Sequence, residues 1–240
     1  MARTAVLEIV ATSAQCAQRA TAAGADRLEA CEVLELGGIT PGPEVLDGIL
    51  GHRPALGVHA LLRSRPGDFV YSEEELRVME RQARRLARAG VDGLVLGTLD
   101  NSASVDLVAV SRLAYAGLEV NPHLEITLHR AIDASADPVA CLAQILGLGV
   151  HRVLTSGGRE TAGEGLRAIT QMVQVANGGI QIMAGGGLRA ADIKPMLQAG
   201  VSAVHFSAKK HHAGTLKVSR TQVQQLRSAL DTLNEQGQDL

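Results

Sequence analysis

The chain has 240 residues, of which 46% are hydrophobic, and its formal net charge is −2. This composition supports a large core and lacks the basic surface that nucleic-acid binding requires. No apolar run approaches the ~18 residues of a membrane-spanning helix. From the charge and the apolar runs together, we expect neither nucleic acid nor membrane as a partner.

Short apolar runs alternate with longer helical patterns along the whole chain. The pattern predicts eight strands, over residues 5–10, 27–31, 55–63, 93–97, 125–130, 152–156, 180–186 and 203–208. A glycine repeatedly closes the helical segment before the next strand, as in AGAD (23–26) and AGVD (89–92). Eight strands joined by helices favour a (β/α)8 TIM barrel over a doubly wound open sheet.

Capping signals mark the starts of two predicted helices. Ser72 is followed by Glu75 in a capping box, and Asp137 precedes a proline in a first turn. The last helix is predicted over residues 218–233. Because the composition shows no break, we expect one domain over residues 1–240, with a frayed tail at 233–240.

Polar side chains recur on one phase of the predicted strands. Alternate residues of a barrel strand point into the interior. The interior phase carries these ionisable or hydroxyl groups: Glu8, Glu29, His59, Arg63, Thr127, His129, His205 and Ser207. Barrel active sites lie where the strands end, so we expect a shared polar site at that mouth. A few satisfied polar residues in a barrel interior are the alternative.

Two carboxylates are expected to lie close together in this site. Glu8 and Glu29 fall on strands that should be neighbours, ~4.8 Å apart. Such a pair does not ionise twice without a cation or metal nearby, so the pKa of one should be raised by the other. That carboxyl would act as a general acid or base, assisted by His129 or His205. The sequence also predicts that Glu8→Gln leaves the fold stable.

Two segments after predicted strands add polar groups to the same mouth. The loop RSRPGDFVYS (63–72) carries Arg65 and Asp68 and two of the four aromatic residues, which suits either a ligand wall or lid or a loop packed on its own barrel. In HRAID (129–133), Arg130 lies on the opposite phase to His129. It therefore either binds a ligand or forms a structural ion pair with Asp133.

A run of glycines follows the seventh predicted strand. Gly185, Gly186 and Gly187 lead directly into a helix, where free backbone N–H groups bind anions. Barrels often hold phosphate at this position, and Ser156 and Ser207 could add donors. The alternative is a tight turn that requires small residues.

The cysteine content gives no sign of disulfides or of a standard metal motif. Cys16, Cys31 and Cys141 are odd in number and widely spaced, which predicts free thiols in a reducing cytoplasm. Only Cys31 lies near the predicted mouth. No organic cofactor is indicated.

Seven motifs together resemble the CutC family: LEI (7–9), GADRLEAC (24–31), GGITP (37–41), RSRPGDFVYS (63–72), HRAID (129–133), LTSGG (154–158) and MAGGGLR (183–189). The resemblance implies a TIM barrel, a cytoplasmic location, a homodimer or higher homo-oligomer, and a role in copper homeostasis with copper as the bound ion.

Some positions depart from the family pattern. Ser64 and Pro66 replace proline and glycine in the 63–72 loop, and Val10 and Ala11 leave the region close after Glu8 without a cysteine. Cu(I) prefers thiolate or thioether ligands, which leaves Cys31 as the metal candidate and Met183 as its nearest soft partner.

Three functions are compatible with these residues. The first is a copper-homeostasis protein that binds Cu(I) through Cys31 and a nearby histidine. The second is an enzyme that uses paired carboxylates and histidines on a small anionic substrate, including phosphorylated ones. The polar residues favour the second, because the mouth is rich in hard groups and poor in thiols. The third is a non-catalytic binding barrel.

Overall fold

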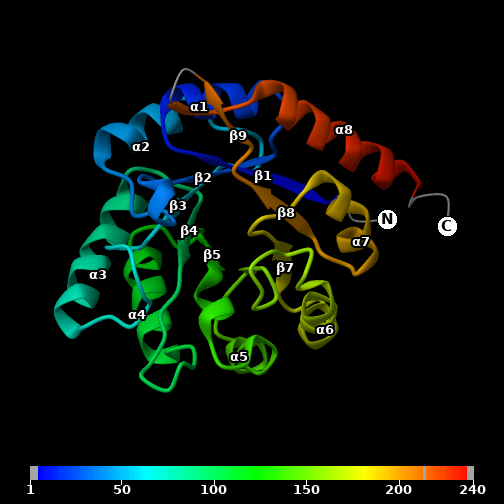
Figure 1. Ribbon diagram of the computed structural model, residues 1–240. Coiled ribbons are helices and arrows are strands. Elements are labelled where there is room, and N and C mark those ends of the chain that lie inside the picture. The colour runs from blue at the N-terminus through cyan, green and yellow to red at the C-terminus, as the bar shows by residue number, and fades with distance from the viewer. Residues whose placement is uncertain (1–4, 213–214, 237–240) are drawn as a thin grey trace.

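The computed structural model describes residues 5–212 and 215–236 and has eight parallel strands in a closed barrel. The strands pair in chain order and β1 pairs with β8, with helices around the outside (Figure 1). This confirms the predicted single-domain TIM barrel. The barrel strands are β1 (Val6–Ala11), β2 (Arg27–Ala30), β3 (Val58–Leu61), β4 (Gly93–Leu96), β5 (Glu125–Leu128), β6 (Arg152–Thr155), β7 (Gln181–Ala184) and β8 (Ala203–Phe206).

Helices follow the strands and begin where the capping signals predicted. Ser72 and Glu75 form the reciprocal capping box of α3, and Asp137 caps α5. The helices are α1 (Ala14–Thr21), α2 (Pro43–Leu50), α3 (Glu73–Arg88), α4 (Leu107–Leu118), α5 (Pro138–Ile145), α6 (Leu166–Ala176), α7 (Ile193–Gln198) and α8 (Arg220–Gln236), and the short 3₁₀ helices are η1 (Leu34–Leu36), η2 (Arg130–Ala134) and η3 (Ala190–Asp192).

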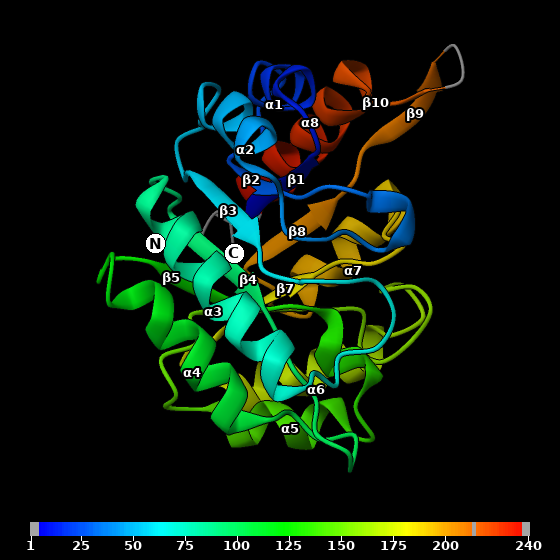
Figure 2. The same cartoon turned by 90° about the vertical axis from the view of Figure 1, so that its left-hand side faces the viewer.

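The C-terminal segment differs from the prediction in two respects. Helix α8 continues to Gln236, so the predicted frayed tail at 233–240 is helical over its first part, and residues 237–240 lie outside the described residues. An unpredicted hairpin, β9 (Lys209–His212) and β10 (Thr215–Val218), precedes it. Figure 2 shows the hairpin extending from the same side of the barrel as the segment after β2. Its strands are mostly polar, so hydrophobic alternation gives no signal.

The strands divide their side chains between two environments, as predicted. Leu7, Ile9 and Leu28 belong to the main core beneath the helices. Inside the barrel lie two small apolar clusters: Val10, Cys31, Leu61 and Val95 in one, and Leu154, Met183 and Ala203 in the other. Much of the remaining interior is polar, and this polar interior forms the floor of the candidate site.

Candidate functional site

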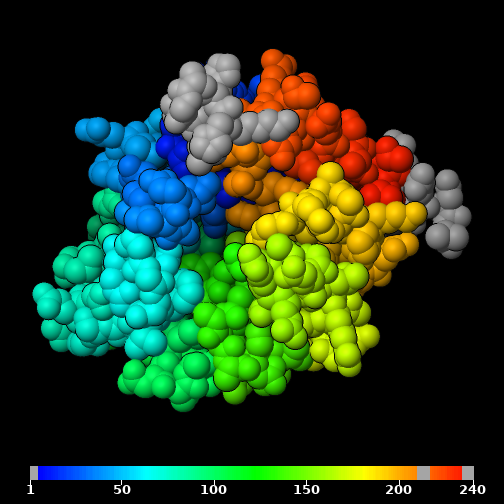
Figure 3. All heavy atoms as spheres, viewed as in Figure 1, coloured from blue at the N-terminus to red at the C-terminus, as the bar shows by residue number. Residues whose placement is uncertain are grey.

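A cavity of about 300 Å³ opens at the mouth of the barrel, where the strands end. Figure 3 looks onto this face and shows it hollowed near its centre. Hydrophobic side chains, among them Phe69 and Phe206, form part of the wall. Eight of the predicted site residues line the cavity: Glu29, Arg63, His129, Arg130, Gly186, Gly187, His205 and Ser207.

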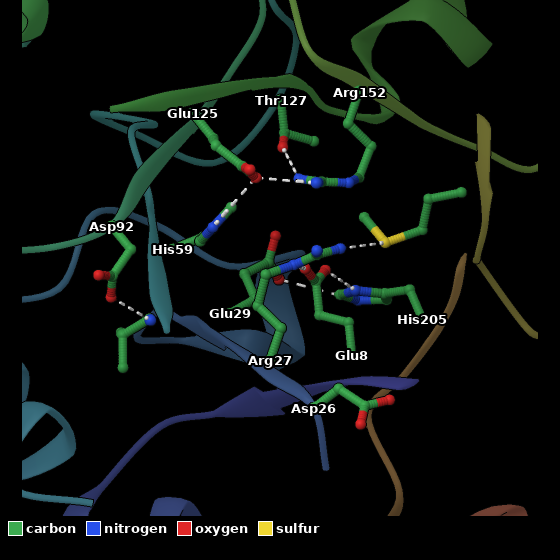
Figure 4. A network of polar contacts seen from close by, with 12 residues as sticks. Glu8, Asp26, Arg27, Glu29, His59, Asp92, Glu125, Thr127, Arg152 and His205 are labelled. Carbon is green, nitrogen blue, oxygen red and sulfur yellow. Dashed lines mark hydrogen bonds and ion pairs between the residues drawn. The ribbon is translucent and has the colours of Figure 1, made fainter. Parts of the chain in front are cut away.

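His205, which lines this cavity, contacts both predicted carboxylates (Figure 4). Its Nδ1 is 2.7 Å from Glu8 Oε1, and its Nε2 is 3.8 Å from Glu29 Oε2. Burial lowers the pKa of the imidazole, but the charges of Glu29 and Glu8 outweigh burial and raise it above the usual value. The two acidic neighbours therefore favour the protonated form of the ring.

The two carboxylates have opposite properties. Burial raises the pKa of Glu8, but Arg27, which donates from Nε to the carboxylate, and His205 together hold it well below 4.5. Glu29 makes no hydrogen bond within the described part of the chain. Burial raises the pKa of Glu29 to about 7, and the charge of Glu8 adds to this rise while that of His205 opposes it. Of the two carboxylates, Glu29 is therefore the one poised to exchange a proton near neutral pH.

Arg27 is the residue of this cluster that the sequence interpretation missed. The strand register places Glu8 opposite Arg27, whereas Glu29 lies opposite Val10. Arg27 is only 2% exposed, and its charge explains why Glu8 stays ionised. The alternation of side chains along the strand could have identified it, because Arg27 precedes Glu29 by two residues and so also points into the barrel.

His59 lies at the opposite end of the barrel from the mouth. Its Nε2 is 3.7 Å from Glu125 Oε2, and the same carboxylate accepts a 2.8 Å hydrogen bond from Arg152. These residues line a second cavity, of about 450 Å³, at the N-terminal ends of the strands. Burial and the charge of Arg27 lower the pKa of His59 to about 3. His59 therefore lines the second cavity and not the mouth cavity, although the strand register places it opposite Glu29.

Arg130 lies against the glycine loop after β7. A Cβ on Gly186 would lie 2.7 Å from Arg130 Cζ, so only glycine leaves room for the guanidinium. Arg130 donates from Nε to Asp133 (2.9 Å) and from Nη2 to Ser156 Oγ (2.9 Å). Arg130 thus forms the ion pair with Asp133, which was one of the two alternatives for it. It leaves Nη1 unpaired within the described residues, at the edge of the cavity.

Asp133 holds the segment after β6 in place beneath Arg130. Its carboxylate accepts hydrogen bonds from the Thr155 hydroxyl, from the Ser156 amide (2.8 Å) and hydroxyl (2.9 Å), and from the Gly158 amide (3.1 Å). Asp133 and Ser156 therefore position Arg130 and do not line the cavity. Gly185 does not line it either: a Cβ there would meet Leu154 and His205 within 3 Å.

One part of the 63–72 loop lines the cavity, and another part holds the loop in place. Arg63 donates to the carbonyls of Gly38 (3.0 Å) and Gly67 (2.7 Å), and its Cζ lies 5.0 Å from the centre of the Phe69 ring, which lines the cavity. By contrast, Arg65 pairs with Asp68 (2.9 Å) and with Glu75 of α3. Arg65 therefore ties the loop to α3, Asp68 holds Arg65 within the loop, and neither lines the cavity.

His129 is a neutral histidine in the cavity wall. Its side chain stacks near Phe69, with 5.1 Å between ring centres, and its Nδ1 accepts a 3.1 Å hydrogen bond from the Ala131 amide. Burial and the nearby charge of Arg63 lower its pKa to about 3. The pKa of His129 is thus lowered, whereas that of His205 is raised.

Cys31 does not have the surroundings of a copper ligand. It is fully buried among Val10, Leu61 and Val95, and burial raises the pKa of its thiol far above the usual range. Met183 belongs to the other interior cluster, and its sulfur accepts a hydrogen bond from Arg27. Cu(I) binds thiolate and thioether sulfur, so these residues do not fit it.

The three groups Glu8, Glu29 and His205 offer ligand atoms within 4.8 Å of one another. This spacing suits a shared cation. However, the Arg27 guanidinium already pairs with Glu8, and the His205 ring contacts both carboxylates. The cluster therefore contains partners for its carboxylates among its own side chains.

These features define a class of protein: a single-domain TIM barrel with a partly polar cavity at the mouth of its strands. The CutC family profile matches residues 5–210. A CutC relative from Erwinia tasmaniensis is 36% identical over 217 residues, covering 90% of this chain and 84% of the relative. A CutC relative from Xanthomonas campestris is 42% identical, covering 84% of this chain and 82% of the relative. The chain belongs to the CutC family.

A solved structure supports the same assignment. The Streptococcus agalactiae protein, described as a copper homeostasis protein CutC, superposes with a TM-score of 0.77 and 30% identity, covering 85% of this chain and 98% of that one. More distant barrels, such as KGPDC from Streptococcus mutans (TM-score 0.65, 14% identity, 95% of this chain and 98% of that one), share the fold alone. Across the described residues, no helix has the length and apolarity to cross a membrane.

Proposed function

We propose that this protein is an enzyme that performs acid–base chemistry on a small anionic substrate bound in the mouth cavity. The observation that carries the proposal is the unequal carboxylate pair. Glu29 faces the cavity with its pKa raised to about 7, while Glu8 is held ionised by Arg27. Glu29 would exchange a proton with the substrate.

His205 would keep the pKa of Glu29 near neutral pH. Its ring is fixed by the 2.7 Å contact with Glu8, so its charge has a constant position beside Glu29. When Glu29 gives up its proton, the cation stabilises the carboxylate that forms. Glu8 and Arg27 act behind this pair as positioning residues.

The cations around the cavity support an anionic substrate. Arg63, Arg130 and Lys209 line it, opposed by the carboxyl of Glu29. Gly186 and Gly187 have positive φ values of 94° and 58°, a conformation that exposes successive backbone N–H groups to an anion. Phosphate is the expected group, held by these amides and Arg130 Nη1.

Inorganic phosphate at millimolar concentration should therefore raise the melting temperature by about 3 °C or more. Gly186→Ala should abolish this shift, because its Cβ would displace the Arg130 guanidinium. Gly147→Ala is the matched control: Gly147 also has a positive φ, of 85°, but has no atom within 4 Å of an added Cβ. Differential scanning calorimetry measures the melting temperatures. If phosphate raises the melting temperature equally in the two variants, the anion site is contradicted.

The copper role implied by the names of the relatives is the rival proposal. Because the Cys31 thiol is buried and resists ionisation, we predict weak Cu(I) binding that Cys31→Ser leaves unchanged. An anaerobic competition titration with a Cu(I) chelator measures this, with Cys141→Ser as the control for loss of a buried thiol. Tight one-to-one binding lost only in Cys31→Ser would favour a copper carrier.

We also propose that the protein works in the cytoplasm as a homodimer or higher homo-oligomer. The three free, buried cysteines suit a reducing compartment. The oligomeric state is expected from the family resemblance and is measured by sedimentation.

A further inference from the structure

Two buried nitrogen donors beside the cavity have no hydrogen-bond partner within the described residues. They are Nε2 of His129 and Nε of Arg63. The two side chains are 5% and 6% exposed, and both line the mouth cavity. Leaving a buried donor unpaired costs free energy, so unpaired donors in a cavity wall indicate a ligand that supplies the acceptor.

The hydrogen bonds around His129 determine which nitrogen carries its proton. Nδ1 accepts from the Ala131 amide, which has only a hydrogen to offer. A neutral imidazole must then carry its proton on Nε2, the unpaired atom. His129 therefore offers a fixed, uncharged N–H donor.

Both donors are held rigidly by their surroundings. Phe69 packs against both side chains, 5.1 Å from the His129 ring and 5.0 Å from Arg63 Cζ. Gly97 leaves the space that the His129 ring occupies, since a Cβ there would lie 2.6 Å from Nδ1. The other Arg63 nitrogens are engaged by backbone carbonyls of Leu36, Gly38 and Gly67.

We infer that His129 and Arg63 bind the carbonyl oxygen of the substrate and stabilise the negative charge that develops on it. Preorganised donors of this kind act where charge appears during a reaction. This inference rests on the proposed function and names its substrate class: a small carbonyl compound that also carries a phosphate or carboxylate group. The reaction class is proton abstraction from the carbon next to that carbonyl.

The groups of the cavity divide this reaction between them. The Glu29 carboxylate takes the proton from the carbon, and the electron pair of the C–H bond moves into the carbonyl to give an enolate. His129 Nε2–H and Arg63 Nε–H donate to the enolate oxygen, while Arg130 and the glycine loop hold the anionic group. Glu29 then returns a proton to carbon, so no oxidant or further reactant is needed.

The first test compares two anions by calorimetry. 2-Phosphoglycolate combines a phosphate with a carboxylate that resembles an enolate, and inorganic phosphate lacks that second group. We expect wild-type protein to bind 2-phosphoglycolate at least about tenfold more tightly than phosphate. His129→Phe should remove this advantage and leave phosphate binding unchanged, and His129→Gln, which keeps a donor, should restore part of it.

The outcomes separate this inference from the proposed function. If the protein binds phosphate, and His129→Phe still binds 2-phosphoglycolate more tightly than phosphate by the same factor as wild type, the inference is overturned and the anion site stands. Failure of the wild type to bind either anion would overturn both.

A second measurement is ¹⁵N NMR of the histidine rings, with His129→Phe to assign the His129 signal. It should show His129 neutral, with its proton on Nε2, between pH 5 and 8. A protonated ring, or a proton on Nδ1, would also overturn the inference.

Discussion

Replacing Glu8 by glutamine is expected to lower the free energy of unfolding by about 3–5 kcal/mol at neutral pH. The substitution keeps the shape of the side chain and removes its charge. Arg27, at 2% exposure, would be left buried without its counter-ion, and His205 would lose one of its two acids. This reverses the expectation from sequence, which paired Glu8 with Glu29 and overlooked Arg27.

The pH dependence of this loss follows from the pKa of Glu8. Because the folded protein holds that pKa below 4.5, the stabilisation is complete above 4.5 and disappears as the pH falls through the folded value. Urea denaturation at several pH values measures it, and Glu8→Leu combined with Arg27→Met is the control. The double variant should recover much of the stability. A single variant as stable as wild type at pH 7 would contradict the buried ion pair.

Replacing Glu29 by glutamine should have the opposite effect and stabilise the protein at alkaline pH. Burial raises the pKa of Glu29 from 4.5 to about 7, so the ionised form is disfavoured in the folded state. A rise of this size corresponds to about 3 kcal/mol. Glu29→Gln removes the charge without leaving a buried cation unpaired, because Glu8 still faces His205.

The sign of the Glu29 effect can be followed across pH. The folded state retains the proton more strongly, so wild-type stability falls as the pH rises from 4.5 to about 7. The gain in Glu29→Gln should be absent below pH 4.5, grow through this interval and level off above it. The same variant should lose activity by about 10²–10⁴-fold once a substrate is known. A pH-independent stability difference would contradict a raised pKa.

Hydrophobic alternation was sufficient to predict the fold and the interior phase of the strands. In VLEIVA, the apolar side chains Leu7 and Ile9 flank Glu8, and the structure buries them beneath the helices. The same reading placed His129 and His205 in the cavity wall. Local capping signals located the starts of α3 and α5 because their hydrogen bonds involve residues only three apart.

Position along the barrel axis could not be predicted from the same signal. His59 and Arg63 share an inward phase, but they are four residues apart, and the structure places one in each of the two cavities. Strand register was also undetermined, so the partner of Glu8 was taken as Glu29 and not Arg27. The position of a residue in the alternating pattern determines whether its side chain points into or out of the barrel. The stagger between neighbouring strands determines which inward side chains contact one another.

The protonation of Glu29 is the most direct test of the proposed acid–base site. Carbon-13 NMR of labelled glutamate carboxyls, with Glu29→Gln to assign the signal, follows it across the pH range. We predict an apparent pKa near 7 for the Glu29 carboxyl in the wild-type protein. A Glu29 signal that titrates near 4.5 would show an ordinary carboxylate and would contradict its role as the proton-exchanging group.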